Sequence, residues 1–181
     1  DYVEVGRITG NLAADVLDGR PVAALPVMDM VPQKLAVNTA VPATLRAAWH
    51  VPPSVLARAA LVVDGTNGVR AQAQDTPGDA VTNAPHCWNI HFLNYAESSL
   101  LDECLEGFHA GLAACGIVTG THCRITLRNA QCQMLNLVTM VDAAVADRAD
   151  LVLVTSTPTL QAAVQRAGTT PVLFTIVANP F

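Results

Sequence analysis

The segment from Asp150 to Ala163 constrains the fold more than any other part of the sequence. An apolar run, Leu151–Val154, is followed by small hydroxyl residues, a proline and a helix-forming run. This order is typical of a buried parallel strand that leads directly into a helix. We expect Thr157 to cap that helix, Pro158 to occupy its first position and Gly168 to follow its end.

Three hydroxyl side chains gather at this strand-to-helix turn, on Ser156, Thr157 and Thr159. The free N–H groups and the positive dipole end of a helix N-terminus favour an anionic group there. Open α/β sheets bind their ligands at the carboxyl ends of the strands. The turn therefore indicates a ligand-binding site, although an ordinary capped turn, of which such folds contain several, explains the same residues.

The composition is that of a globular protein without a nucleic-acid partner. The chain has 181 residues, of which 51% are hydrophobic and 14% charged, and its net charge is −5. That length allows one ordinary domain with a sizeable core. The negative charge and the lack of a Lys/Arg cluster argue against nucleic acid, and no apolar run approaches the ~20 residues that span a bilayer.

The sequence opens on Asp1-Tyr-Val-Glu with neither an initiator Met nor a signal-peptide pattern, from which we expect processed or cut material. The five cysteines include no C-x-x-C, and the five histidines have no metal-ligand spacing, so we expect no metal site and no cofactor. Cys104 and Cys115 fall in an amphipathic helical pattern and should be buried. A disulfide in an oxidising compartment stays open.

From residue 88 onward, strand patterns alternate with helix patterns. This alternation predicts an α/β fold with a parallel sheet and helices on both faces. We expect strands at 88–93, 123–127, 151–154 and 172–177, and helices at 99–116, 134–145 and 159–167. Ser99 and Asp102 suggest a capping box. The expected buried helix positions are Leu101, Cys104, Leu105, Phe108 and Leu112, then Met134, Val138, Val141 and Val145.

The first part of the chain is less regular. Apolar residues at helical spacing predict a helix at 2–17, closed by Gly19. We further expect a strand at 34–38, a helix at 40–49 and another at 54–60 that Ser54 caps. The polar, turn-rich run 64–83 predicts a linker. Trp49 and Trp88 lie beside Pro-rich breaks and are expected to be packing anchors rather than stacking platforms for a ligand.

The second half resembles the amino-terminal lobe of ABC-transporter substrate-binding proteins of the tryptophan/tyrosine uptake group. The matching segments are His91–Tyr95, Leu105–Leu112, Arg128–Gln131, Ala149–Ala163 and Thr170–Pro180. The resemblance implies a periplasmic-binding-protein-like lobe with a Rossmann-like or flavodoxin-like sheet.

The first half resembles the carboxy-terminal end of the same family, in Tyr2–Gly19 and Val51–Ala59. We therefore divide the chain into a carboxy-terminal segment at 1–63, a linker at 64–83 and a first-lobe half at 84–181. A bacterial parent protein with two tandem binding domains explains this order. The alternative explanation is that separate pieces of one domain have been joined or proteolysed. In either case we expect one lobe-like α/β unit without the second lobe of the family.

A protein of this family holds a small organic solute, such as an amino acid, in the cleft between two lobes and delivers it to a membrane permease. The resemblance thus implies a periplasmic or extracellular, membrane-associated parent without catalytic activity. It places the first-lobe ligand contacts at strand ends, on Asn94, Tyr95, Glu97, Ser156, Thr157, Thr159, Ala178 and Asn179.

Among these residues, the hydroxyls of the 156–159 turn would hold a carboxylate, Tyr95 would lie against an apolar ligand body and Asn179 would orient a polar group. Simpler roles fit too, since asparagine often satisfies turn backbone and Glu97 would complement a helix dipole. Asn129 and Gln131 would line the cleft or a solvated turn. A ligand-sensing domain of a signalling protein is the alternative function, and pairing of two copies through a lobe surface stays open. A nucleotide-using enzyme is disfavoured because no strand is followed by a phosphate-binding glycine motif.

Overall fold

The structure, a computed structural model, describes residues 1–27, 35–39, 50–59, 61–63, 69–71 and 86–178. The chain divides into two compact units. The larger unit combines Asp1–Met30 with Pro77–Phe181, and the smaller one is Val31–Thr76. The amino-terminal helix therefore packs in the same unit as the second half of the chain.

The smaller unit contains a three-stranded sheet. Strand β1 (Ala36–Asn38) pairs in parallel with β2 (Leu61–Val63), and β3 (Val69–Ala71) pairs with β2 in the antiparallel sense. Strand β3 lies inside the run expected to be a linker, so strand pairing reaches into that polar segment. The division of the chain at 63 and 84 stays a prediction.

A single helical turn, α2 (Pro53–Leu56), completes the described part of this unit. The expected Ser54 cap is wrong, because Pro52 is the N-cap residue and Pro53 begins the helix. Proline fits the first helical position since its ring fixes a helical φ and its missing N–H has no acceptor there. The helix expected at 40–49, and Trp49 with it, lie outside the described residues.

The larger unit is built on a parallel sheet of four strands in the order β5-β4-β6-β7. The strands are β4 (Trp88–Asn94), β5 (Cys123–Asn129), β6 (Leu151–Thr155) and β7 (Val172–Thr175). The central strand β6 is buried at every position, as an apolar run in a sheet covered on both faces requires. The predicted α/β fold with a parallel sheet is confirmed.

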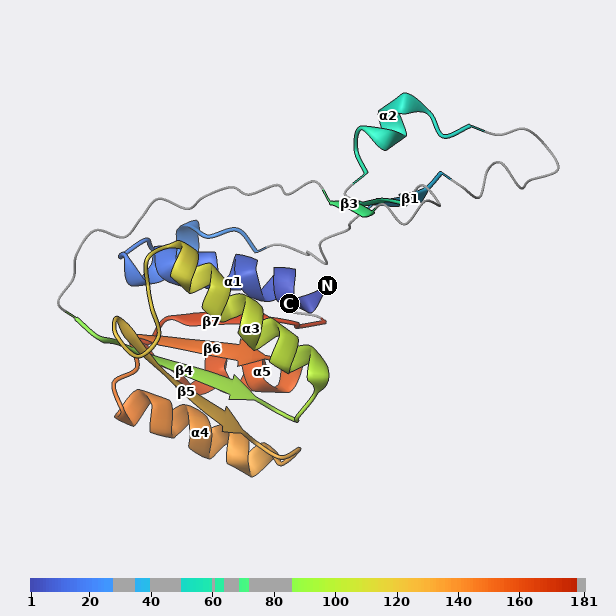
Figure 1. Cartoon of the computed structure of the whole chain (residues 1–181). Coiled ribbons are helices and arrows are strands. Elements are labelled where there is room, and N and C mark those ends of the chain that lie inside the picture. Colours follow the sequence, from blue (N-terminus) through green and yellow to red (C-terminus); the bar gives the residue numbers. More distant parts are fainter. Residues whose placement is uncertain (28–34, 40–49, 60, 64–68, 72–85, 179–181) are drawn as a thin grey trace. The chain divides into compact units, whose positions relative to one another are not determined.

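Two helices cover each face of this sheet (Figure 1). Helices α1 (Tyr2–Leu17) and α3 (Ser99–Ala114) pack on one face, and α4 (Met134–Ala146) and α5 (Thr157–Arg166) pack on the other. A short 3-10 turn, η1 (Val22–Ala24), follows α1.

The expected capping box of α3 is wrong by one residue. Ser98 is the N-cap, and its hydroxyl oxygen accepts a hydrogen bond from the backbone N–H of Leu100 at 3.2 Å. Of the two adjacent serines, Ser98 has the extended backbone of an N-cap residue, whereas Ser99 is already the first helical residue.

The buried face of α4 also differs from the prediction. Met134 is 52% and Val145 36% exposed, whereas Val141 is fully buried. The helix buries its face through Leu137, Met140, Val141 and Ala144. The helix is apolar on several sides, so periodicity alone did not fix which side meets the sheet.

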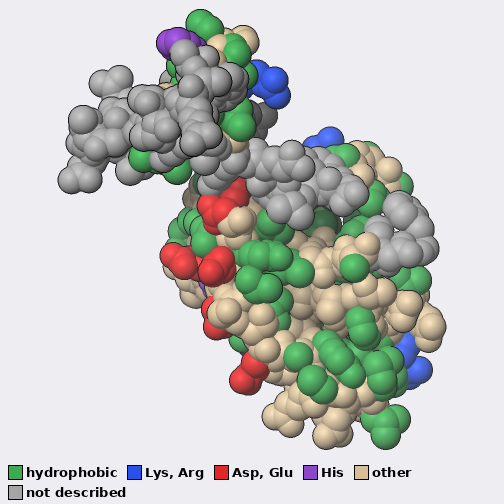
Figure 2. All heavy atoms as spheres, turned by 90° about the vertical axis from the view of Figure 1, so that its right-hand side faces the viewer, with side chains coloured by type: hydrophobic (Ala, Val, Ile, Leu, Met, Phe, Trp, Pro, Cys, Tyr) green, Lys and Arg blue, Asp and Glu red, His purple; other side chains and the backbone are tan. Residues whose placement is uncertain are grey.

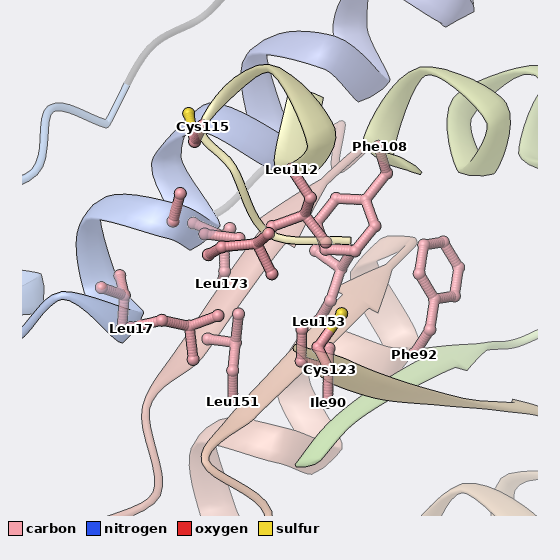
Figure 3. Packing of buried hydrophobic residues seen from close by; sticks show 14 residues of the cluster. Leu17, Ile90, Phe92, Phe108, Leu112, Cys115, Cys123, Leu151, Leu153 and Leu173 are labelled. Carbon is pink, nitrogen blue, oxygen red and sulfur yellow. The ribbon is translucent and has the colours of Figure 1, made fainter. Parts of the chain in front are cut away.

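The core between the sheet and the pair α1 and α3 is closely packed (Figure 3). The rings of Phe92 and Phe108 meet edge to face with centroids 6.2 Å apart. Trp88 packs against the same cluster, in agreement with its expected anchoring role. Cys104 and Cys115 are buried as predicted.

Helices α1 and α3 meet through their backbones at four glycines. Gly6 and Gly10 on α1 face Gly107 and Gly111 on α3. A Cβ atom at Gly6 would overlap the carbonyl oxygen of Cys104, and the corresponding atom on each α3 glycine would overlap a carbonyl oxygen of α1. No side chain fits between the two helices here, so the glycines set the distance between them.

We predict that Gly107→Ala lowers the free energy of unfolding by about 1–3 kcal/mol, because the added methyl group overpacks a backbone contact. Helix propensity alone predicts the opposite sign, a gain of about 1 kcal/mol. Urea unfolding followed by circular dichroism measures the change. Ala110→Gly, at an exposed interior position of the same helix, calibrates the propensity contribution. A stabilised Gly107→Ala variant would contradict the contact.

Candidate functional site

The four strands of the larger sheet end in a row of polar residues. Asn94 at the end of β4 pairs with Asn129 on β5, and Thr155 on β6 pairs with Thr175 on β7. The last recorded β4–β6 pair joins Leu93 and Val154, so Asn94 and Thr155, each one residue later, lie level with each other. Residues at one level of a parallel sheet point to the same face. The row therefore crosses the whole sheet, above the apolar core and on the side of α1 and α3.

Three members of this row are buried: Asn94 is 5%, Thr155 1% and Thr175 7% exposed. The Asn94 amide nitrogen donates to the carbonyl oxygen of Ala96 at 3.4 Å, which holds the turn after β4. The Asn94 Oδ1 and the Thr155 Oγ1 are buried and have no hydrogen-bond partner among the described residues. Buried polar atoms of this kind are costly and are concentrated at functional sites.

The turns that follow β5, β6 and β7 contain residues with positive φ. The values are 52° for Gln131, 60° for Cys132, 73° for Ser156 and 55° for Ile176. Residues other than glycine rarely adopt a positive φ, and β-branched residues such as isoleucine adopt it least often. Such strain of about 1–3 kcal/mol persists where the surrounding structure holds it and is typical of ligand-binding sites.

The turns after β4 and β5 are tied to each other. The Tyr95 hydroxyl donates to the carbonyl oxygen of Cys132 at 2.8 Å, and the Cys132 N–H donates to the Tyr95 carbonyl oxygen at 2.8 Å. The side-chain oxygen of Asn129 accepts from the Gln131 N–H at 2.7 Å, which forms the local turn. Two neighbouring strand ends thus form one rigid rim, and Asn129 has the turn-forming role that asparagine often has.

The hydroxyl-rich turn leads from β6 into α5. Ser156, not Thr157, is the N-cap, so Thr157 and Pro158 are the first two helical residues and the expected cap position is wrong by one. The Ser156 hydroxyl lies 3.0 Å from that of Thr159, which is fully buried, and it does not cap the backbone. Gly168 follows the end of α5 with φ 59°, as predicted.

This arrangement leaves the N-terminal amides of α4 and α5 without a side-chain cap. The N-cap residues are Gln133 and Ser156, and the side chain of neither accepts a hydrogen bond from a backbone N–H of its own helix. Neither helix has an acidic residue in its first turn. The first N–H groups of a helix have no partner within it, and they carry its positive dipole end. The carboxyl edge of the sheet therefore suits an anionic group.

Figure 2 faces this edge of the sheet. Hydrophobic and uncharged side chains cover much of the face, and acidic side chains gather along one flank. In the ranges that the structure describes, no group of three or more His, Cys, Asp or Glu residues could hold a metal ion. The edge thus combines apolar surface, uncapped amides and hydroxyl groups, which are features of a site for a small organic ligand.

The structure places most of the predicted site residues at this edge. Glu97 is exposed in the turn before α3, Thr157 is partly exposed, and Ala178 is exposed after β7. Asn179 lies outside the described residues. Thr155, Thr175, Cys132 and Ile176 were not predicted. A polar residue that closes an apolar strand is the signal that could have found the two threonines.

The family model described as "ABC transporter substrate binding protein" matches residues 89–181, about half of the chain. The chain belongs to this family. The match begins in β4 and includes all four strands of the larger sheet and the turns at its carboxyl edge. It excludes α1, which packs on the matched region.

A curated relative, the "Tyrosine-binding protein" of Clostridioides difficile, is 32% identical over 92 residues, which are 51% of this chain and 27% of the relative. The structure of a conserved domain protein from Vibrio cholerae matches with a TM-score of 0.50 and 28% identity over 51% of this chain and 31% of that one. The ABC domain of Streptococcus pneumoniae in complex with L-Trp gives a TM-score of 0.49 and 26% identity over 52% and 32% of the two chains.

The matched region therefore spans about a third of the length of each of these similar proteins. Among the described helices, none is both long enough and apolar enough to cross a membrane.

We predict that Gln131→Gly raises the free energy of unfolding by about 0.5 kcal/mol. A φ of 52° strains any residue with a side chain by about 1–2 kcal/mol, and glycine relieves this strain. The relief exceeds the free energy that glycine loses through the larger conformational entropy of its unfolded chain. The matched control is Gln161→Gly, at an exposed helical position of α5, which should lower stability by about 1 kcal/mol. Urea unfolding of both variants checks the opposite signs, and a loss of stability at both positions would contradict the strained turn.

Proposed function

We propose that the full-length protein containing this chain is the solute-binding component of an ABC transporter and captures an amino acid with an aromatic side chain. The carboxyl edge of the larger sheet forms one wall of the binding cleft. The family membership and the uncapped, hydroxyl-lined start of α5 carry this proposal. The printed name of the Clostridioides difficile relative supports tyrosine as the first ligand to test.

The carboxylate of the ligand binds at the start of α5. Thr157 supplies a hydroxyl and a first-turn N–H, and Ser156 supplies a second hydroxyl. Their amides need no cation to hold the negative charge, because the helix dipole and the free N–H groups favour it. Thr159 is fully buried and lies against Ser156, so it orients the Ser156 hydroxyl rather than contacting the ligand.

The other groups of an amino acid meet the remaining strand ends. The Tyr95 hydroxyl donates to the Cys132 carbonyl oxygen and so fixes the position of the ring. This ring lies beside the apolar body of the ligand. Glu97, which is exposed in the turn before α3, attracts the ammonium group, and Asn94 offers an acceptor oxygen. Ala178, after β7, completes the described part of the wall, and Asn179 stays a predicted contact outside the described residues.

A second lobe, outside this chain, supplies the opposite wall, and the closed protein delivers its ligand to a membrane permease. The family is one of substrate-binding proteins rather than enzymes, and its members are typically periplasmic or extracellular. The match to a transport family favours this function over a ligand-sensing domain of a signalling protein. Pairing of two copies through a lobe surface stays a prediction.

We predict that Thr157→Val weakens the binding of L-tyrosine by the full-length protein about tenfold or more. The substitution keeps the shape of the side chain but removes a hydroxyl that donates to a carboxylate, and hydrogen bonds to charged groups contribute about 1.5–3 kcal/mol. Isothermal titration calorimetry measures the dissociation constant.

Thr121→Val is the control, because Thr121 is exposed in the loop before β5, at the opposite end of the strands. It should bind L-tyrosine like the natural protein. Equal affinities of all three proteins would remove Thr157 from the site, and the absence of binding to any amino acid would refute the proposed ligand class.

A further inference from the structure

A buried hydroxyl contact joins the amino-terminal helix to the end of β7. The Thr9 hydroxyl oxygen on α1 lies 3.3 Å from that of Thr175, which is 166 residues away in sequence. It also donates to the Val5 carbonyl oxygen at 2.8 Å. The Thr175 side chain also hydrogen bonds with the buried thiol of Cys104 on α3. We call Cys104, Thr175 and Thr9 the hydroxyl chain.

The hydroxyl chain has one consistent direction. The Thr9 hydroxyl donates to the Thr175 hydroxyl oxygen as well as to the Val5 carbonyl oxygen, so these two acceptors share its single proton. Thr175 in turn donates to the sulfur of Cys104, a contact that lowers the pKa of the thiol. Burial has the larger effect and raises the pKa of Cys104 to about 11, so the thiol keeps its proton at neutral pH. All three groups are buried, where a satisfied network is rigid.

Thr175 stands directly before a strained position. Ile176 has a φ of 55°, which a β-branched residue adopts only where its surroundings hold it. The neighbour of Thr175 on β6, Thr155, has no partner for its hydroxyl among the described residues, so it does not hold this strand end through that group. The described side-chain contact that fixes the end of β7 is the one to Thr9 and Cys104.

We propose that Thr9 is a positioning residue of the ligand site: through Thr175 it holds the turn after β7, the corner that carries Ile176 and Ala178. The inference rests on the proposed function in treating this turn as part of the site. It also gives α1, which lies outside the family match, a role in shaping the matched region. The glycine contact with α3 brings α1 close enough for Thr9 to reach the sheet.

Amide hydrogen exchange of the full chain tests the proposal without any ligand. In Thr9→Val, the peptide that covers 172–178 should exchange about two- to tenfold faster, while the peptide at 151–155 stays unchanged. Thr9→Ser keeps the hydroxyl and should restore slow exchange. Thr9→Ala gives the same test with a smaller side chain, should the valine variant fail to fold.

Thr139→Val is the matched control, since Thr139 on α4 makes the same bond to its own helix, with Leu135 at 3.0 Å, but is exposed and contacts no strand end. It should leave the exchange of 172–178 unchanged. Equal acceleration in every strand of the Thr9→Val protein, no acceleration at 172–178, or no rescue by serine would overturn the positioning role.

Titration of the same variants of the full-length protein with L-tyrosine separates this inference from the proposed function. Thr9→Val should weaken binding about two- to tenfold, and Thr9→Ser and Thr139→Val should not. Failure of every variant, and of the natural protein, to bind would refute the ligand class and leave the exchange result to decide on Thr9. Tight binding by Thr9→Val with faster exchange at 172–178 would show that this corner does not contact the ligand, and would overturn the proposal.

Discussion

The backbone contact between α1 and α3 is the interaction on which the rest of the larger unit depends. Glycines on both helices let carbonyl oxygens of one lie against Cα atoms of the other. This distance brings Leu17 of α1 over the sheet together with Phe108 and Leu112 of α3, so one apolar core covers the whole face. A segment from the start of the chain thereby becomes part of a fold that the second half otherwise builds.

The same contact links the core to the candidate site. On the face that α1 and α3 cover, the sheet below the level of Asn94 and Thr155 is packed with apolar side chains, and at that level it ends in polar ones. Beyond this row, the backbone turns through strained positions and into helices whose first amides are uncapped. The packed layers provide the rigidity, and the strand ends provide the groups that can recognise a small molecule. Because α1 reaches this level through Thr9, residues from both ends of the chain meet next to the candidate site.

The sequence predicted the parallel sheet, its strands and the buried face of α3, because apolar runs of strand length and helical spacing depend on local pattern. It placed the caps of α3 and α5 one residue late, since neighbouring Ser and Thr residues compete for the same role and only the backbone decides between them. Asn94, Tyr95, Ser156 and Thr157 lie at the carboxyl edge of the sheet, and their contact with a ligand stays a prediction. Asn179 lies outside the described residues. Thr155 and Thr175 were not predicted as site residues because threonine is also common in strand interiors. The glycine contact was not predicted because it joins helices about 100 residues apart in the sequence.

The central claim is that the carboxyl edge of the larger sheet is one wall of an amino-acid site. A crystal structure of the full-length protein with bound L-tyrosine tests it most directly. We expect the ligand carboxylate within hydrogen-bonding distance of the Thr157 hydroxyl or N–H, and the ligand body against the rim formed by Tyr95 and Cys132. A bound ligand that contacts none of the strand ends after β4, β5, β6 and β7 would contradict the claim.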